Sequence, residues 1–137
     1  GVVRAMLEHL RAGGAVLTFP AGTIEPDPAV RPGADASLAA WVPTPDALAR
    51  RVPGLRVAGA VVSGVHTRRG LEHPLTRLHR EASDRDWFGA VLQLLVPRLR
   101  TRSVRVDVGP ALTASEVEGS LGDAVLRTVR ERLASFG

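Results

Sequence analysis

Prolines crowd one stretch of this 137-residue chain and rule out long regular elements there. Six of the ten prolines lie between residues 20 and 45. Each one fixes its own φ, removes a backbone N–H donor and pushes the preceding residue towards extended backbone. Within this stretch only 34–41 leaves room for a short helix. Long irregular segments in compact domains are usually functional loops or disordered, and the stiffness of these prolines favours an ordered loop.

Apolar residues recur at helical spacing in four other stretches. They predict helices over 2–12, 46–52, 84–96 and 121–135, with Asp84 capping the third. The residues expected to be buried on 84–96 are Trp87, Phe88, Val91, Leu94 and Leu95, and those on 121–135 are Leu121, Val125, Val129 and Leu133.

Strand patterns lie between these helices. The runs 15–19 and 55–62 are short and nearly continuously apolar, which is typical of strands buried on both faces of a parallel sheet. In 104–108 valines alternate with charged residues, which predicts a half-buried strand nearer the sheet edge. A capping box at 113–116 predicts a short helical turn, and 67–83 is expected to be mostly loop. Together the patterns predict an α/β fold with a central, largely parallel or mixed sheet flanked by helices.

Composition limits the chemistry. At 137 residues and 45% hydrophobic, the chain fits one domain or a large piece of one. All 18 basic residues are arginine, a bias spread along the whole chain that indicates a GC-rich genome. Cysteine is absent, which excludes disulfides, thiol catalysis and Cys-ligated metal sites.

The charge of the chain favours anionic partners. The formal net charge is +4 and the sequence pI is about 11.3, which suits phosphate groups, anionic lipid or nucleic acid. Nucleic-acid binding is disfavoured, because the arginines are dispersed and lack interleaved aromatics. No apolar run reaches the roughly 18 to 20 residues needed to cross a bilayer. The helical pattern already begins at Gly1, so the chain is expected to be a fragment.

The run Phe19-Pro20-Ala21-Gly22-Thr23 is the strongest candidate for a binding site. It follows a predicted buried strand, and open α/β sheets bind ligands at the C-terminal ends of their strands. Gly22 would let a phosphate approach the backbone N–H groups, and Thr23 would add a hydroxyl donor. The alternative from these residues alone is a proline-glycine turn without a ligand.

Four segments in register resemble the glycerol-3-phosphate and lysophospholipid acyltransferases. That family carries a strand followed by Phe-Pro-Glu-Gly-Thr-Arg, an alanine-rich segment, a valine-rich strand and a late strand ending in Gly-x-Pro. The counterparts here are Phe19 to Ile24, Gly33 to Ala40, Val57 to Val62 and Val104 to Pro110. The resemblance implies that residues 1–137 are the C-terminal portion of a single such domain, incomplete at the N-terminus.

The resemblance also implies an activity. It is transfer of a fatty acyl group from acyl-CoA or acyl carrier protein to a lysophospholipid or glycerol-phosphate acceptor, in phospholipid biosynthesis. No metal or bound cofactor is expected, since the thioester is a co-substrate. The implied location is the cytoplasmic face of a membrane, with peripheral contact to anionic lipid or an anchor outside this sequence. The substrate-binding residues that it implies are Phe19, Pro20, Gly22, Thr23 and Glu25.

Two positions depart from the family pattern. Ala21 replaces its glutamate and Ile24 replaces the arginine thought to hold the substrate phosphate. Glu25 or Asp27 is therefore expected to take a different role, such as contact with an acceptor hydroxyl or an arginine.

The family's catalytic His-x4-Asp element lies upstream of the Phe-Pro-x-Gly-Thr strand, so no catalytic residue is assigned in this chain. The 18 residues before Phe19 contain one histidine, His9, which is expected on the polar face of its helix. His79 and Asp84 have the right spacing, but they follow the Gly-Thr strand and match a solvated loop and an N-cap.

Other features keep alternatives open. His66, close to a predicted strand end, is a candidate to line the site. No Gly-x-Ser-x-Gly elbow is present, which argues against a serine hydrolase. The arginines after 62 and 96 could meet phospholipid headgroups, although a solvated face explains them as well. The competing function is a non-catalytic module that binds lipid or an acyl carrier with the same fold.

Overall fold

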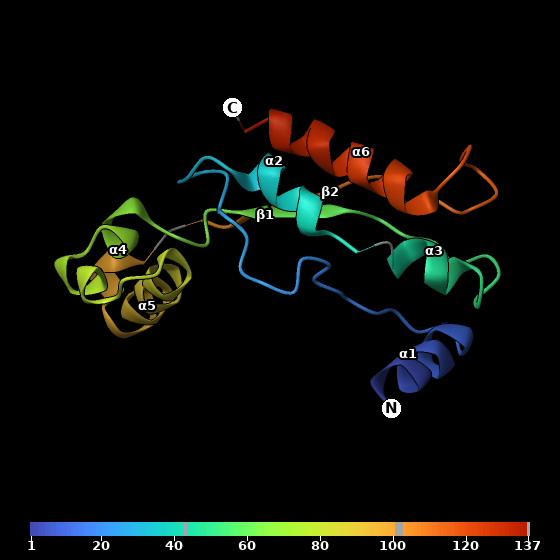
Figure 1. The fold of residues 1–137 in the computed structure, drawn as a ribbon, viewed down its shortest axis with the longest axis horizontal. Helices are drawn as coiled ribbons and strands as arrows, with labels where there is room; N and C mark the ends of the chain where they lie inside the picture. The colour runs from blue at the N-terminus through green and yellow to red at the C-terminus, as the bar shows by residue number, and fades with distance from the viewer. Residues whose placement is uncertain (43, 101–102, 137) are drawn as a thin grey trace.

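The structure is a computed structural model that describes residues 1–42, 44–100 and 103–136. Its elements are shown in Figure 1. The helices are α1 (Val2–Arg11), α2 (Ala34–Ser37), α3 (Thr44–Ala49), α4 (Arg68–Leu71), α5 (Ala82–Leu95) and α6 (Leu121–Ala134). Short 3₁₀ turns are η1 (Leu38–Ala40), η2 (Pro74–Leu78) and η3 (Pro97–Leu99), and the strands are β1 (Ala60–Ser63) and β2 (Arg105–Val108).

The sheet differs from the prediction. In the described residues it has two strands, and β1 pairs with β2 antiparallel, from Ala60 opposite Val108 to Ser63 opposite Arg105. A bridge between Val57 and Leu112 extends the pairing towards the start of the predicted strand 55–62. The described residues thus combine helices with a small antiparallel sheet, which agrees with a general α/β class, but they do not show the predicted central, largely parallel or mixed sheet flanked by helices.

Residues 15–19 do not form a strand. They are apolar, but in the described residues no neighbouring segment offers them a ladder of hydrogen bonds, and an apolar run alone cannot make a strand. Leu17 and Phe19 are therefore 78% and 75% exposed. The prediction of a buried strand here was wrong.

The four predictions of helices outside the proline-rich stretch were confirmed. α1, α3, α5 and α6 begin and end within about three residues of the predicted ranges. On α6, Leu121, Val125 and Val129 are buried and Leu133 packs against the core, which confirms the predicted stripe.

Details of the region between 67 and 99 were wrong. The predicted loop contains α4 and η2, because the Thr67 hydroxyl accepts the Gly70 N–H and caps α4. Asp84 lies in the first turn of α5, and Glu81 occupies the N-cap position. The predicted burial of three α5 residues also failed: Trp87, Leu94 and Leu95 are 58%, 71% and 72% exposed.

The main core lies between the sheet and α6. Val61 on β1, Leu38 on η1 and Val129 on α6 are buried together, and Trp41, Leu126, Leu133 and Phe136 pack around them. Gly59 lets α6 approach, since a Cβ there would come within 2.4 Å of Val129 Cγ2. In Figure 1 α6 runs along the sheet on one side.

The opposite face of the sheet is uncovered. Val62, Val106 and Val108 are 46%, 59% and 57% exposed, whereas Asp107 between the two β2 valines is half-buried. Alternation is present in β2, as predicted, but the valines are on its open face. The alternation of valines and charged residues in β2 did not indicate which face of the sheet α6 would cover.

Two smaller units flank the core. α5 packs on α4, where Gly89 lies close to Leu71 and the Gln93 amide bonds the backbone of Val65 and Thr67. α1 has no buried residue, and its Arg11 guanidinium donates to the Arg51 carbonyl at 3.0 Å. Figure 1 shows α1 and the α4–α5 pair at different ends of the molecule.

The N-terminus of α6 is capped from a distance. The Asp46 carboxylate accepts the backbone N–H of Leu121 at 2.8 Å and of Gly122 at 3.1 Å, and it accepts the Ser120 hydroxyl at 2.9 Å. Burial raises the pKa of Asp46, but these hydrogen bonds and the Arg50 charge outweigh burial, so the pKa is lowered. This contact ties α3 to α6.

Replacing Asp46 by Ala should lower the free energy of unfolding by about 1–2 kcal/mol, because two N–H donors of α6 lose their acceptor. Urea denaturation measures the loss, and Asp123→Ala on the same helix end is the control, with a loss of only a few tenths of a kcal/mol. Because the folded-state pKa is lowered, the contribution of Asp46 is present above the ordinary carboxyl pKa and is lost as pH falls through the folded pKa. An equal loss in both variants would contradict the assignment.

Candidate functional site

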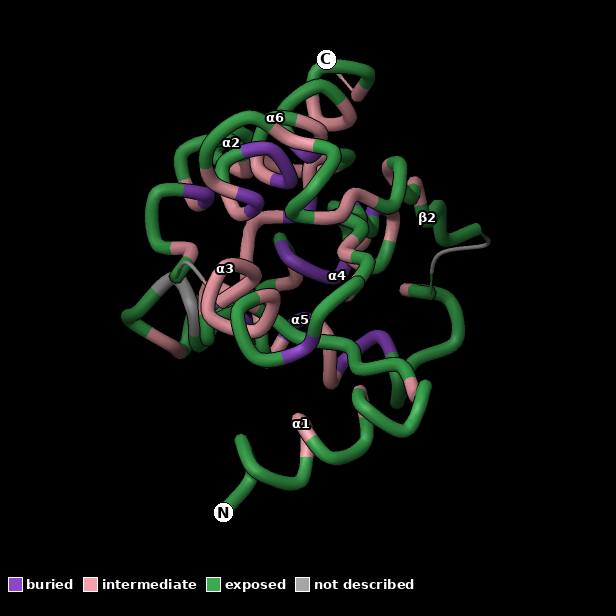
Figure 2. The backbone as a smooth tube through the Cα atoms, turned by 90° about the vertical axis from the view of Figure 1, so that its right-hand side faces the viewer, coloured by how far each residue is buried: buried purple, intermediate pink, exposed green. Residues whose placement is uncertain are grey.

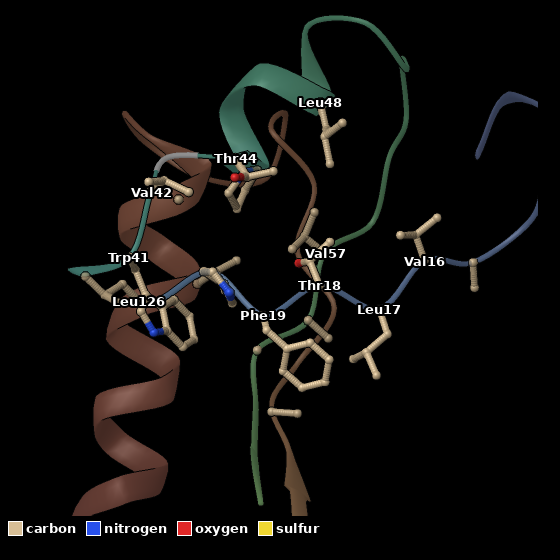
Figure 3. Close-up of a pocket in the computed structure, with 18 of the residues that line it drawn as sticks. Val16, Leu17, Thr18, Phe19, Trp41, Val42, Thr44, Leu48, Val57 and Leu126 are labelled. Atoms are coloured by element: carbon tan, nitrogen blue, oxygen red, sulfur yellow. The ribbon is translucent and has the colours of Figure 1, made fainter. Parts of the chain in front are cut away.

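A large apolar cavity opens beside the sheet. Its volume is about 1280 Å³, and it lies between residues 13–27, the chain from 41 to 66 and the N-terminal half of α6. Figure 3 shows Val16 to Phe19 crossing the cavity, with Trp41, Leu48 and Leu126 among the residues around it. Specific small-molecule sites are usually concave, mainly apolar and supplied with a few polar groups. This cavity is therefore the candidate site of the described chain.

All five residues predicted to bind substrate line this cavity: Phe19, Pro20, Gly22, Thr23 and Glu25. Gly22 has a φ of +65° and donates its N–H to the Phe19 carbonyl at 3.1 Å, which closes a tight turn. The glycine is thus needed for a left-handed backbone, and the turn directs Thr23 to the cavity wall. That these residues bind substrate remains a prediction.

Glu25 has partners within the chain. Its Oε1 accepts the Ser37 hydroxyl at 2.9 Å and the Trp41 indole N–H at 2.8 Å. These bonds hold α2 and the indole against the proline-rich loop. In the described residues Glu25 forms no ion pair with an arginine, and its contact with an acceptor hydroxyl stays a prediction.

Asp27 joins the loop to the end of β1. It is only 7% exposed. Its Oδ1 accepts the N–H groups of Ala29 and Gly64 at 3.0 and 3.1 Å, and its Oδ2 accepts the N–H of His66 at 3.0 Å. A buried carboxylate with three N–H donors is well satisfied. It holds the segment after β1 against the proline-rich loop at Asp27.

His66 consequently lines the same cavity, as the sequence suggested. It is half-buried, and in the described part of the chain its imidazole has no hydrogen-bond or ion-pair partner. The exposed cation Arg56 also lines the cavity. Two hydrogen bonds from Thr113 lower the pKa of Glu116, and the charge of Arg56 lowers it further. Sequence reasoning missed Trp41 and Arg56, because neither belongs to a motif and only the fold brings them to this wall.

The remaining histidines lie elsewhere. The His79 ring packs on Phe88 with centroids 4.8 Å apart, and Asp84 is exposed on α5. Neither lines the cavity, so their His-x4-Asp spacing does not assemble a dyad there. His9 is exposed and its ring lies over Gly14, in agreement with a polar-face position. Ser63 is buried on β1 and does not line the cavity.

None of the helices in the described residues is both long and apolar enough to cross a membrane. No group of three or more His, Asp or Glu side chains among these residues comes together as metal ligands would.

Comparisons with family models, with curated proteins and with solved structures find no match to this chain.

Replacing Asp27 by Ala should destabilise the chain by about 1–3 kcal/mol, because the N–H groups of Gly64 and His66 lose a buried acceptor. Chemical denaturation measures the loss, and faster proteolytic cleavage within 20–33 should accompany it. Asp35→Ala is the control, since its carboxylate is 73% exposed and its ion pair with Arg130 spans 3.5 Å. Unchanged stability and cleavage in Asp27→Ala would show that the loop is held by other contacts.

Proposed function

We propose that this chain is the C-terminal portion of an O-acyltransferase domain. The complete domain would transfer a fatty acyl group from acyl-CoA or acyl carrier protein to a lysophospholipid or glycerol-phosphate acceptor. One observation carries the proposal: the segment Phe19 to Ile24, which bears the family resemblance, lines an apolar cavity of about 1280 Å³. Ligand pockets commonly measure roughly 300–1,000 Å³, so this space can take an acyl chain together with a headgroup.

The walls of the cavity suit the two ends of such a substrate. Val16, Leu48 and Val57 contribute apolar side chains for the hydrocarbon. At the Gly22 turn the backbone is open to close approach, and Thr23 offers a hydroxyl donor for a phosphate. The imidazole of His66 and the guanidinium of Arg56 line the same cavity and are further donors for a phosphate, a contact that Ile24 cannot make.

The chemical step that we propose uses groups upstream of this chain. A histidine would take the proton of the acceptor hydroxyl while the oxygen attacks the thioester carbonyl, and an aspartate would orient the histidine. Collapse of the tetrahedral intermediate would form the ester bond, break the carbon–sulfur bond and release the thiol. This chain would position the acceptor, at the cytoplasmic face of a membrane and in peripheral contact with anionic lipid.

A second candidate is a non-catalytic lipid- or acyl-carrier-binding module. Two observations favour it. The carboxylates of Glu25 and Asp27 are both engaged by donors of the chain itself. In addition, neither His79 nor Asp84 reaches the cavity. Such a binding module would need the apolar walls and the Gly22 turn, but it would not need a general base.

Acylation of a lysolipid panel by the full-length protein distinguishes the two candidates. We expect thioester-dependent transfer, and Thr23→Ala should lower kcat/KM roughly 10- to 100-fold, the effect of one lost hydrogen bond to a charged group. Thr113→Ala, at a half-buried threonine that does not line the cavity, is the control and should leave the rate unchanged. No transfer with lipid binding retained would favour the module, and loss of both would overturn the proposal.

A further inference from the structure

The outer edge of β2 is open. In the described residues β2 pairs only with β1, and Val104, Val106 and Val108 are 52%, 59% and 57% exposed. Figure 2 shows β2 as an exposed segment at the margin of the molecule. Soluble proteins commonly cover, shorten or charge such edges, because a row of unpaired N–H and C=O groups is a template for another strand.

The register with β1 decides which backbone groups face outwards. The Gly109 N–H donates to the Gly59 carbonyl at 2.8 Å, so this pair is hydrogen-bonded. Bonded and non-bonded pairs alternate along an antiparallel ladder. The N–H and C=O groups of Arg105 and Asp107 therefore point to β1, and those of Val106 and its valine neighbours point to the open edge.

When β2 pairs with β2 of a second copy, the N–H and C=O groups on the open edge of one strand must lie opposite those on the open edge of the other. For two antiparallel strands related by a two-fold axis, this condition holds when the axis passes through a single residue of β2. The central choices are an axis at Arg105, at Val106 or at Asp107.

The charges of Arg105 and Asp107 favour one of these three registers over the other two. An axis at Arg105 places that arginine opposite its own copy, and an axis at Asp107 does the same with two carboxylates, so both registers put like charges side by side. An axis at Val106 places Arg105 of each copy directly opposite Asp107 of the other. In that register the two side chains form a non-bonded pair, in which side chains approach most closely.

We propose that this chain forms a two-fold dimer by antiparallel pairing of β2 with β2 of a second copy, centred on Val106. The two copies then share one four-stranded sheet, in the order β1-β2-β2-β1. Val106 lies opposite its copy, and Val104 lies opposite Val108. The new backbone bonds and the contacts between valines provide the affinity, while the two Arg–Asp pairs set the register, since exposed ion pairs alone contribute little.

The surroundings of β2 leave room for this pairing. Among the core contacts of α6, Val129 packs on Val61 of β1 rather than on β2. Asp107 is already held by Arg132 at 3.2 Å and by Arg105 of its own strand at 2.9 Å, which fixes its carboxylate on the α6 side of the sheet. The ring of Phe136 lies under the Arg105 guanidinium, 4.4 Å from the ring centroid. Both charged side chains are thus oriented before a second copy arrives.

Sedimentation velocity on this chain tests the dimer. The wild-type mass should rise with concentration from 14.5 kDa towards twice that value. Val106→Pro removes an outward N–H on an edge strand and should abolish association. Val62→Pro removes the equivalent outward N–H on the other edge of the sheet, and its mass should rise as in the wild type. Far-UV circular dichroism checks that each variant is folded.

Two charge variants test the register. Arg105→Asp places carboxylates opposite each other, and Asp107→Arg places guanidiniums opposite each other, so each folded variant alone should sediment as a monomer. An equimolar mixture of the two should associate, because every opposing pair is then of opposite charge. A purely structural role of these residues in the monomer would not restore association in the mixture. A wild-type monomer at all concentrations, a dimer that persists in Val106→Pro, or a mixture of folded variants that stays monomeric would each overturn the proposal.

Discussion

The buried Asp27 carboxylate is the contact on which the candidate site depends. The proline-rich loop has few regular hydrogen bonds of its own, and prolines remove donors that might have formed them. Asp27 replaces part of this missing network by accepting the N–H groups of Gly64 and His66. Through these bonds the loop that carries the Gly22 turn is fixed against the end of β1. The cavity wall therefore combines two segments about 40 residues apart in the chain.

A second set of contacts positions the rest of the wall. Glu25 holds the Trp41 indole, and Asp46 holds the N-terminus of α6 beside α3. In each case a carboxylate accepts donors from a segment that is distant in the sequence. Such charge-assisted bonds are stronger than neutral ones. Glu25 and Asp46 thus act mainly in structure, whereas the side chains of His66, Arg56 and Asp123 line the cavity without a hydrogen-bonded partner in the described residues.

The longer helices and two of the three predicted strands could be found from the sequence, but the pairing of the strands could not. The stripe of Leu121, Val125 and Val129 is a local pattern, and a helix satisfies its backbone within itself. A strand needs a partner, and the partner of β1 lies more than 40 residues away. The apolar run 15–19 looks like a strand by composition, but nothing in the described residues pairs with it. The residues of the Gly22 turn could be found because they form a motif, whereas Trp41 and Arg56 reach the cavity only through the fold.

Exposed apolar surface is the feature that links fold and function here. The walls of the cavity, the valine face of the sheet and the outer side of α5 all present large side chains to solvent. Contiguous apolar surface on a folded chain usually marks a binding site for lipid or for another protein. We assign the cavity to a lipid or acyl ligand and the β2 edge to a second copy of the chain.

Backbone amide mapping by nuclear magnetic resonance tests the central claim most directly. A ¹⁵N-labelled chain would be titrated with a 1-acylglycerol 3-phosphate below its micelle concentration. The account predicts chemical-shift changes concentrated at Gly22, Thr23 and His66, together with the apolar wall around Val57. Changes confined to α5 or to Val106 and Val108 of β2, or no changes at all, would contradict it.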